Sequence, residues 1–266
     1  MEKNFYRTIW ISDLHLGSTQ CQADVLLDFL KNNESDKLYL VGDIIDFWAL
    51  SKKMYWPTEH NTVIQKVLKK ARHGTQVIYI PGNHDENIRD YDSYVFGDIT
   101  VKNCDYHTTA DGKHFLIVHG DEYDTIAQYH KWIAKLGSVG YDFLLQVNRL
   151  LKMIRRFLGI RSNFSLAAFV KFKVKNVVQF ISDYEESLVN TLRNEDLDGV
   201  ICGHIHHAEI KMLNQFLYVN TGDFVESCTA IVEEQDGNLK LIHWFDERKK
   251  IAEQTAISEP RLPAAT

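Results

Sequence analysis

Short runs of β-branched, aromatic and aliphatic residues recur along this chain, and each is followed at once by a polar motif. The pairs are TIWIS before DLHLGS, KLYLV before GDIID, QVIYI before PGNHDE, HFLIV before HGDEYD, and GVIC before GHIHH. Each run has the length and composition of a strand that is buried on both faces. Helical patterns over 23–32 and 60–73 separate some of the runs, so we predict an α/β fold. Ligands of open α/β sheets collect beyond the carboxyl ends of strands, where all five motifs are expected to lie.

Three later runs, QFLYVNTGDF, CTAIVEE and LKLIHWF, also have the composition of strands. A DG pair, which is common in hairpin turns, separates the last two. We therefore expect these runs to be joined by hairpins and to add further, partly antiparallel sheet.

The chain has the composition of a globular protein built as one domain with an insertion. It has 266 residues, of which 45% are hydrophobic and 25% charged. Its first residues lack the basic start and apolar run of a signal peptide, and no uncharged stretch is long enough to span a membrane. These features favour a cytoplasmic protein. The four cysteines, which form no CxxC pair, are expected to be reduced.

The middle of the chain differs from the remainder in charge and in pattern. Between 125 and 182, ten Lys and Arg residues stand against a single acid, although the whole chain has a net charge of −6. Polar and apolar positions over 141–158 separate onto two faces of a helix, and 164–193 is also largely helical in pattern. We predict a basic helical insertion whose partner is anionic.

These patterns define the predicted domain organisation. The main domain covers 1–246, the helical lid insertion covers 125–193, and the tail over 247–266 is expected to be mobile. Two interpretations of the insertion stay open. It is either a packed cap with a solvated basic face, or a surface that binds an anionic lipid interface.

Seven side chains in the five motifs are of the types that bind metals used in phosphate chemistry. Carboxylate, carboxamide and imidazole groups suit Mn²⁺, Fe or Zn²⁺. Asp and His alternate in DLH, and two His alternate in GHIH, so each pair can point to one side of an extended chain. The set is large enough for two ions that share one carboxylate. The candidate ligands are Asp13, His15, Asp43, Asn83, His119, His204 and His206.

The order DxH, GDxxD, GNHD, HG and GHxH resembles the calcineurin-like metallophosphoesterase family, over roughly Thr8 to Phe224 without the insertion. The resemblance implies two β-sheets packed as a sandwich and flanked by helices. It assigns one ion to Asp13, His15 and His206, the other to Asn83, His119 and His204, and the bridge to Asp43. Two such ions activate water for in-line attack on phosphorus.

The resemblance also gives roles to two further residues. His84 occupies the position from which the family protonates the leaving oxygen or stabilises the transition state. Asp46 either orients a metal-binding side chain or only caps the start of a helix. Bacterial members of the family favour manganese, which is therefore the expected metal, with Fe or Zn²⁺ as alternatives.

Within the family the chain is most similar to the UDP-2,3-diacylglucosamine pyrophosphatases of lipid A synthesis, which carry a helical lid between the HG and GHxH motifs. The similarity implies cleavage of a lipid-linked pyrophosphate to UMP and a lipid monophosphate, at the cytoplasmic face of the inner membrane. The candidate substrate-binding residues are Asp124, Arg155, Arg156 and Arg161.

One motif departs from that group, which carries GNRD where this chain has GNHD at 82–85. A related lipid-linked substrate is therefore an open alternative, as is a phosphodiesterase or nuclease acting on another nucleotide or on nucleic acid. Nucleic acid is disfavoured because the apolar residues of the basic segment are mainly aliphatic and offer few stacking surfaces. A docking module without catalysis is disfavoured by the complete set of ligands.

Overall fold

The computed structural model describes residues 3–123, 180–193 and 195–249. The chain divides into two units, residues 1–121 with 188–266 and residues 122–187. Asp124, Arg155, Arg156 and Arg161 lie outside the described residues, as do most of the predicted lid and of the predicted tail. The domain boundaries therefore stay predictions. Within the described ranges, no helix is both long enough and apolar enough to cross a bilayer.

The first unit contains a seven-stranded mixed sheet in the order β12-β11-β1-β2-β3-β5-β4. Its central strands β1, β2, β3 and β5 are parallel, whereas β11, β12 and β4 are antiparallel to their neighbours. The strands are β1 (Asn4–Ile11), β2 (Asn33–Val41), β3 (Gln76–Ile80), β4 (Val95–Phe96), β5 (Ile99–Val101), β11 (Thr229–Glu233) and β12 (Leu239–His243).

A second sheet of five strands has the order β6-β7-β8-β10-β9. Strands β7, β8 and β10 are parallel, and the edge strands β6 and β9 are antiparallel to them. The strands are β6 (Asp105–Thr108), β7 (His114–Ile117), β8 (Gly199–Cys202), β9 (Glu209–Leu213) and β10 (Phe216–Asn220).

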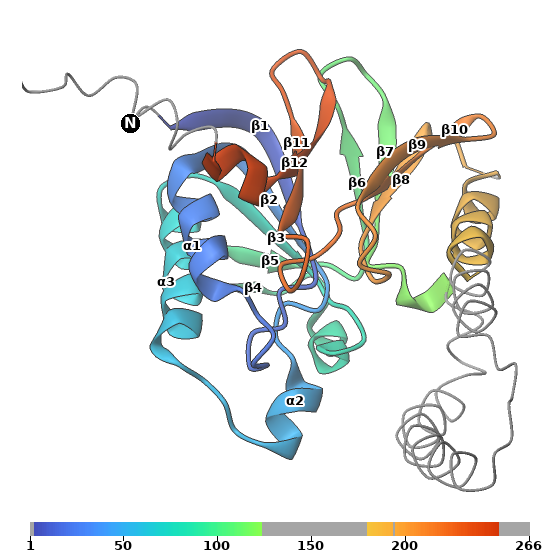
Figure 1. The fold of residues 1–266 in the computed structure, drawn as a ribbon. Helices are drawn as coiled ribbons and strands as arrows, with labels where there is room; N and C mark the ends of the chain where they lie inside the picture. The colour runs from blue at the N-terminus through green and yellow to red at the C-terminus, as the bar shows by residue number, and fades with distance from the viewer. Residues whose placement is uncertain (1–2, 124–179, 194, 250–266) are drawn as a thin grey trace, which may run out of the picture. The chain divides into compact units, whose positions relative to one another are not determined.

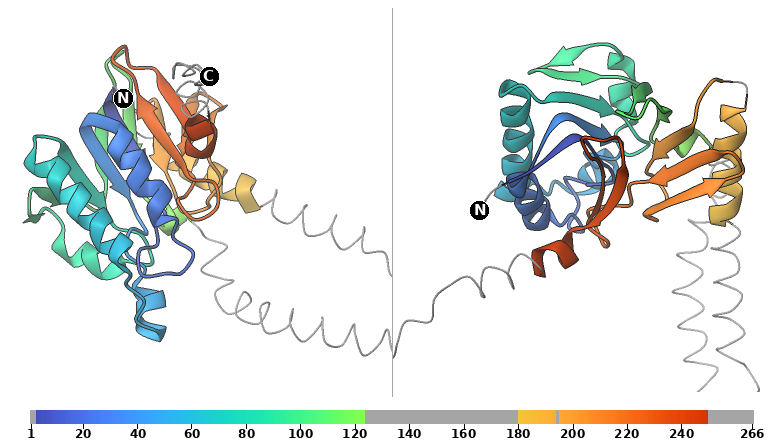
Figure 2. Two further views of the ribbon diagram at one scale, coloured as in Figure 1. Left: turned by 60° about the vertical axis from the view of Figure 1, so that its left-hand side comes forward. Right: turned by 90° about the horizontal axis from the view of Figure 1, so that it is seen from above.

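Helices cover one face of the first sheet, and the second sheet covers the other (Figures 1 and 2). The described helices of this unit are α1 (Ala23–Asn32), α2 (Phe47–Lys52) and α3 (Thr58–Arg72), with a short 3-10 turn at Glu86–Tyr91. A second 3-10 turn, Asp121–Tyr123, begins at the last residue of the segment 1–121. Residues 180–192 are also helical. The predicted two-sheet α/β sandwich flanked by helices is therefore confirmed.

Successive side chains of the central strands point to opposite faces, and this explains why the first sheet is covered on both sides. Ile9 and Ile11 of β1 pack in the layer shared with α1 and α3, while Trp10 between them packs in the layer between the two sheets. In β2, Leu40 packs in the layer shared with the helices, and Val41 packs in the layer between the two sheets. Because successive side chains of a strand point to opposite faces, a run that is apolar at every position must be covered on both sides.

The predicted hairpins are correct for one pair of strands and wrong for the other. Strands β11 and β12 form the expected hairpin across the DG turn. Strand β10 belongs to the second sheet and β11 to the first, so the connection over 221–228 passes between the sheets. Strand β10 pairs instead with β9, across a turn in which Asn214 has a φ of 57°. Asparagine tolerates this left-handed conformation well.

A buried carboxylate ties the two sheets together. Glu233, at the end of β11, is fully buried and forms an ion pair with Arg7. It also accepts hydrogen bonds from Thr8 Oγ1 and the Ala110 amide, both at 2.8 Å, and lies 2.8 Å from His107 Nε2. Burial works to raise the pKa of Glu233, but these partners, led by His107 and Arg7, lower it to about 2.

We expect Glu233→Gln to lower the free energy of unfolding by about 3 kcal/mol at pH 7, because it leaves buried donors without an anionic acceptor. A depressed folded-state pKa stabilises the protein above the ordinary value of 4.5 and ceases to do so as the pH falls toward 2. The difference between the variant and the wild type should therefore shrink from pH 4.5 downward. Urea unfolding of both proteins at pH 7 and pH 3 measures it, and a constant difference would contradict the assignment.

Candidate metal centre

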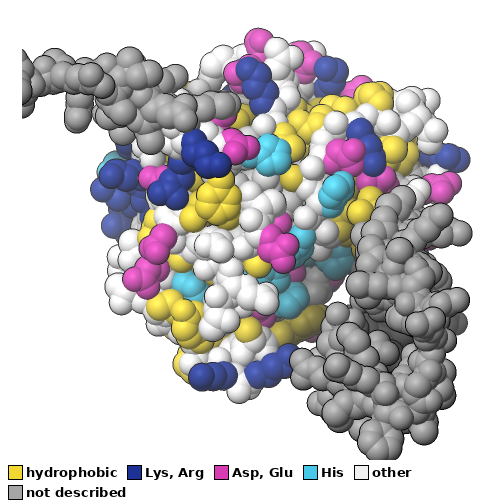
Figure 3. All heavy atoms as spheres, in the orientation of Figure 1, with side chains coloured by type: hydrophobic (Ala, Val, Ile, Leu, Met, Phe, Trp, Pro, Cys, Tyr) yellow, Lys and Arg dark blue, Asp and Glu magenta, His cyan; other side chains and the backbone are white. Residues whose placement is uncertain are grey.

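All seven predicted ligands follow directly on strands whose carboxyl ends meet at one edge of the sandwich. Asp13 and His15 follow β1, Asp43 follows β2, and Asn83 follows β3. From the second sheet, His119 follows β7, and His204 and His206 follow β8. Figure 3 shows histidine and acidic side chains gathered near the centre of one face.

Backbone hydrogen bonds join the loops that carry these residues. The Asp13 amide donates to the Gly42 carbonyl at 3.0 Å, and the His15 amide donates to the Asp43 carbonyl at 2.9 Å. Within the second sheet, the Gly203 amide donates to the His119 carbonyl at 3.1 Å, and the His204 amide donates across to Asp13 Oδ2 of the first sheet at 3.1 Å. The loops therefore form one connected unit, as a preorganised site requires.

Five of the candidates have left-handed backbone conformations. The φ angles lie between 50° and 71°, at Asp13, His15, Asp43, His204 and His206. This conformation costs a non-glycine residue about 1–2 kcal/mol. Such strain gathers at functional sites, where the surrounding structure holds it. Here it allows a chain leaving a strand to turn sharply, so that side chains of successive motifs face one point.

Three overlapping groups of side chains among the described residues have the spacing of metal sites. They are Asp13, His15 and His206; Asp13, Asp43 and His119; and His15, Asp46 and His84, with the ligand atoms of each group within 4.8 Å of one another. His206 Nε2 lies 3.1 Å from Asp13 Oδ1.

The carboxylate of Asp43 lies between two histidines. Its Oδ1 is 3.5 Å from His119 Nε2, and its Oδ2 is 3.9 Å from His15 Nε2. The two oxygens of one carboxylate thus face opposite sides of the cluster. This is the placement expected of a group that bridges two cations.

Asn83 and His204 complete the cluster. The carboxamide oxygen of Asn83 is buried. The imidazole of His204 lies against that of His119 with ring centroids 5.3 Å apart, and its backbone amide donates to Asp13 Oδ2 at 3.1 Å. The second predicted ion would use these side chains together with His119.

Buried polar atoms without hydrogen bonds show that the donor set fits cations. Among the described residues, Asp13 Oδ1, Asn83 Oδ1 and His119 Nε2 are buried and make no hydrogen bond. Native structures satisfy nearly all such atoms, because each unsatisfied one costs about 1–3 kcal/mol. A divalent cation would accept the lone pairs of all three kinds of ligand, so the residues present suit metal ions.

The glycines of three motifs give these ligands their space. A Cβ atom on Gly82 would lie 2.6 Å from His119 Nε2, and a Cβ on Gly42 would collide with the same imidazole. A Cβ on Gly203 would lie 2.6 Å from Asp13 Oδ2. The glycines of GDIID, GNHD and GHIH are therefore required by the close approach of ligand side chains.

The electrostatics of the cluster favour added positive charge. Burial works to raise the pKa of Asp13, but the neighbouring imidazoles of His206 and His119 lower it below its ordinary value. The pKa of Asp43 is also lowered, against the effect of burial, chiefly by His119. Burial opposes a charge on His119, yet Asp43 and Asp13 raise its pKa to about 10. In the metal-free protein, imidazole groups such as that of His119 supply the positive charge that the carboxylates favour.

Asp46 makes the contacts that each of its two predicted roles requires. Its Oδ1 accepts a hydrogen bond from the Ala49 amide at 2.7 Å, which caps α2. The same carboxylate lies 2.9 Å from His84 Nδ1 and 3.2 Å from His15 Nδ1. A contact to the second ring nitrogen fixes the orientation of an imidazole. His84 is further enclosed by the indole of Trp48, with ring centroids 4.2 Å apart.

Residues that the sequence interpretation passed over hold the loops in place. Asp85 is fully buried and accepts hydrogen bonds from the Gly82 amide at 2.5 Å, the Ile44 amide at 2.8 Å and the Tyr79 hydroxyl at 2.5 Å. It thereby joins the GNHD and GDIID loops. Its presence in GNHD was the only signal in the sequence. Asp223 performs the same task for the loop over 221–228, where it accepts from the Val225 amide at 2.8 Å.

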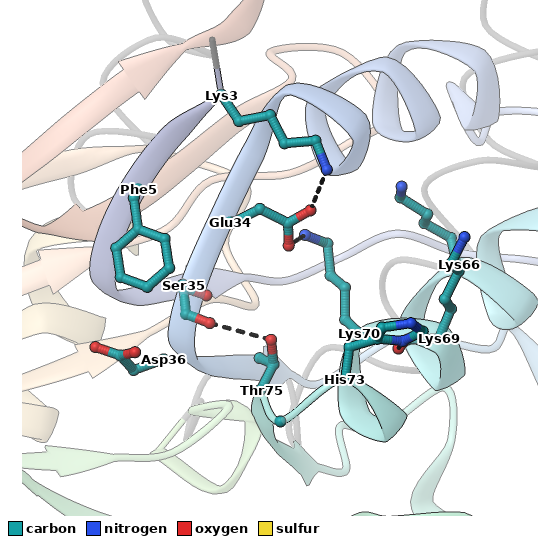
Figure 4. A pocket seen from close by; sticks show the side chains of 11 residues that line it. Lys3, Phe5, Glu34, Ser35, Asp36, Lys66, Lys69, Lys70, His73 and Thr75 are labelled. Atoms are coloured by element: carbon teal, nitrogen blue, oxygen red, sulfur yellow. Dashed lines mark hydrogen bonds and ion pairs between the residues drawn. The ribbon is translucent and has the colours of Figure 1, made fainter.

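A hollow of about 400 Å³ at the other edge of the first sheet is separate from the centre (Figure 4). Its lining comes from the starts of β1, β2 and β3 and from the end of α3, whereas the ligands follow the strand ends. Glu34 pairs with Lys3 at 2.8 Å and with Lys70 at 2.6 Å. Basic residues at a helix C-terminus are favoured by the helix dipole, which accounts for the lysines of α3.

The family of the chain follows from this arrangement and from comparison with known proteins. Residues 6–208 match the family of calcineurin-like phosphoesterases, and the chain belongs to that family. It is therefore a metal-dependent hydrolase of phosphoric esters or anhydrides, as the motif order predicted.

Individual proteins within and beyond this family are also similar to the chain in sequence or in fold. The UDP-2,3-diacylglucosamine hydrolase of Haemophilus influenzae (strain PittGG) is 27% identical over 88% of this chain and 97% of the relative. The enzyme of that name from Aliivibrio fischeri (strain MJ11) is 27% identical over 76% of this chain and 82% of the relative. Among solved structures, a Vps29 single mutant from Entamoeba histolytica matches with a TM-score of 0.41 and 11% identity, over 88% of this chain and 97% of the other.

Proposed function

We propose that this protein hydrolyses the pyrophosphate bond of UDP-2,3-diacylglucosamine or of a related lipid-linked nucleotide, releasing UMP and a lipid monophosphate. The relatives that carry the name of this activity align with most of the chain. The observation that supports hydrolysis most directly is the group of buried Asp, Asn and His atoms that lack hydrogen-bond partners at the strand ends. The relatives' names supply the substrate class.

We propose the following division of the ligands between two divalent ions. Asp13, His15 and His206 hold one ion, Asn83, His119 and His204 hold the other, and Asp43 contacts both. Ions bound there supply Lewis-acid activation of water and neutralise charge on the phosphoryl group. The mixed oxygen and nitrogen donors suit Mn²⁺, which we propose as the physiological metal, with Fe or Zn²⁺ as alternatives.

The protein's own contribution to proton transfer is assigned to His84. Burial works to lower the pKa of its imidazole, but Asp46 and Asp43 raise it above its ordinary value. Asp46 and Asp43 thus favour the protonated imidazole, which is the form that can donate to the leaving oxygen. The contacts of Nδ1 with Asp46 and of the ring face with Trp48 leave Nε2 as the donor.

Metal binding is expected to release protons. Because the pKa of His119 is about 10 in the metal-free protein, its Nε2 carries a proton at neutral pH that a cation must displace. Nδ1 donates to the Val41 carbonyl at 2.9 Å and keeps its proton. Each proton released makes the apparent affinity for Mn²⁺ rise about tenfold per pH unit. Calorimetric titrations at pH 6.5 and 7.5, in two buffers of different ionisation enthalpy, measure this, and an affinity independent of pH would contradict it.

The substrate proposal includes a place in the cell, the cytoplasmic face of the inner membrane, because the lipid portion of the substrate resides in a bilayer. The basic segment over 125–182, which lies mostly outside the described residues, supports an anionic surface as the partner. Arg155, Arg156, Arg161 and Asp124 remain proposed substrate contacts.

A comparison of substrates tests the proposed function. Manganese-loaded protein is incubated with UDP-2,3-diacylglucosamine in mixed micelles, a small soluble phosphodiester, a phosphomonoester and single-stranded nucleic acid. We expect the lipid-linked nucleotide to be cleaved fastest, with UMP and the lipid monophosphate as the products. Faster cleavage of nucleic acid or of the simple phosphodiester would overturn the substrate assignment and favour a general phosphodiesterase.

A further inference from the structure

An exposed group of aromatic and apolar side chains lies on α2 and the loop that follows it. Trp48, Met54, Tyr55 and Trp56 have exposed fractions of 37%, 77%, 37% and 37%. No residue of α2 itself is buried. We call these four residues, with Lys52 and Lys53 between them, the aromatic tip. Large apolar side chains gathered at the surface commonly mark a binding surface.

The aromatic tip begins at the metal centre. Trp48 packs on His84, and Asp46 both caps α2 and contacts His84 and His15. Figure 1 and the left view of Figure 2 show α2 projecting from the edge of the first sheet at which β1, β2 and β3 end. A surface that bound the tip would therefore lie close to the catalytic residues.

The composition of the tip matches the interface of an anionic lipid bilayer. Tryptophan and tyrosine are enriched where an apolar body meets a polar, hydrated layer. Lys52 and Lys53 are exposed, and no carboxylate of the described residues forms an ion pair with either. Each lysine near an anionic membrane favours binding by about 1 kcal/mol.

A second exposed aromatic group provides a contrast. Tyr91, Tyr94 and Phe96 are 49%, 61% and 51% exposed and contact one another, with Tyr94 and Phe96 stacked at 6.3 Å between centroids. The exposed acids around them, Asp90, Asp92 and Asp98, would be repelled by anionic lipid. The lysines of the hollow in Figure 4 have the required charge, but they lie at the opposite edge of the sheet. The tip combines charge, apolar surface and proximity to the metal centre.

We propose that the aromatic tip is the surface by which this protein docks on an anionic lipid bilayer, so that a lipid-linked substrate reaches the metal centre without leaving the membrane. The role of membrane docking in this inference rests on the proposed function, namely on a lipid-linked substrate. Docking itself is tested without substrate, which keeps a failure of the inference distinct from a failure of the proposed function.

Flotation of the full chain with vesicles tests the proposal. Wild type should bind vesicles of phosphatidylcholine with 30% phosphatidylglycerol and bind pure phosphatidylcholine at least about tenfold more weakly. Met54→Ser/Trp56→Ser should weaken binding to the anionic vesicles about tenfold or more. The matched variant Tyr94→Ser/Phe96→Ser should bind like wild type. Metal content and unfolding temperature establish that each variant is folded.

A second pair of matched variants tests the contribution of the positive charge of the tip. Lys52→Glu/Lys53→Glu should weaken binding by about tenfold or more, whereas Lys66→Glu/Lys69→Glu, in the hollow of Figure 4, should change it less than threefold. Equal losses in the two pairs would show that overall charge governs binding and would overturn the proposal. Unimpaired binding by Met54→Ser/Trp56→Ser, or no binding of wild type to either vesicle, would overturn it as well.

Contact with the acyl region has a direct spectroscopic readout. Vesicles with brominated acyl chains quench the fluorescence of indoles that enter the bilayer. Trp56→Phe keeps an aromatic ring at the tip, so the protein should still bind but show less quenching than wild type. Unchanged quenching would show that Trp56 does not enter the membrane and would refute the proposed docking surface.

Discussion

Asp43→Ala is expected to abolish hydrolysis, with a loss of at least about 10⁴-fold, and to weaken the binding of both ions. The carboxylate faces His119 with one oxygen and His15 with the other. Its removal takes a ligand from each proposed ion and leaves two imidazoles without their counter-charge. Its Oδ1 also accepts a hydrogen bond from the His84 amide at 2.8 Å, so the proposed proton donor loses part of its support.

Elemental analysis and the hydrolysis rate check this prediction together. Asp28→Ala is a matched control, because Asp28 lies on α1, where it accepts a hydrogen bond from Trp244 and pairs with Arg248. That variant should keep metal content and rate near those of wild type. An Asp43→Ala protein that retained two equivalents of metal, or retained activity, would show that Asp43 does not bridge.

His84→Ala should separate metal binding from catalysis. The imidazole contacts Asp46 and Trp48, and its Nε2 lies 3.9 Å from Asp43 Oδ2. We expect the variant to keep its metal and to lose about 10²–10³-fold in rate, which is the usual contribution of a general acid. His73→Ala, at the exposed end of α3, serves as the control and should be unaffected.

The dependence of this loss on the leaving group identifies the role of His84. A proton donor is needed most when the leaving oxygen is strongly basic, so aryl phosphodiesters with acidic phenols should suffer less than alkyl phosphodiesters. An equal loss on both kinds of substrate would argue that His84 stabilises charge on the phosphoryl group instead. Loss of metal from the variant would indicate that it supports the ligands.

The sequence was most informative where local pattern and chemistry coincide. Each buried run of the two sheets is apolar at successive positions, so the strands and their burial on both faces could be predicted from the pattern, whereas the two-sheet sandwich was implied by the resemblance to the family. The ligands directly follow those runs, and parallel strands bring their carboxyl ends to one edge. Thus Asp13, Asp43 and His119 could be predicted to meet although they lie far apart in the chain.

The features that were missed depend on contacts distant in the sequence. Helix α2 has six residues, none of them buried, so it shows no apolar stripe. The contact between the rings of Trp48 and His84 follows from the cap formed by Asp46 and cannot be inferred from spacing. The hydrogen bonds of Asp85 go mainly to backbone amides, which no motif specifies. The transfer of the chain from β10 to β11 depends on sheet packing, whereas the run itself suits a hairpin equally well.

Titration of the metal-free protein with Mn²⁺, with hydrolysis of a soluble phosphodiester recorded at each addition, tests the central claim most directly. The claim is that the residues at the five strand ends hold two ions and that hydrolysis requires both. The account predicts that activity rises mainly with the second equivalent and stops rising at two per chain. Full activity at one equivalent, or activity of the metal-free protein, would contradict it.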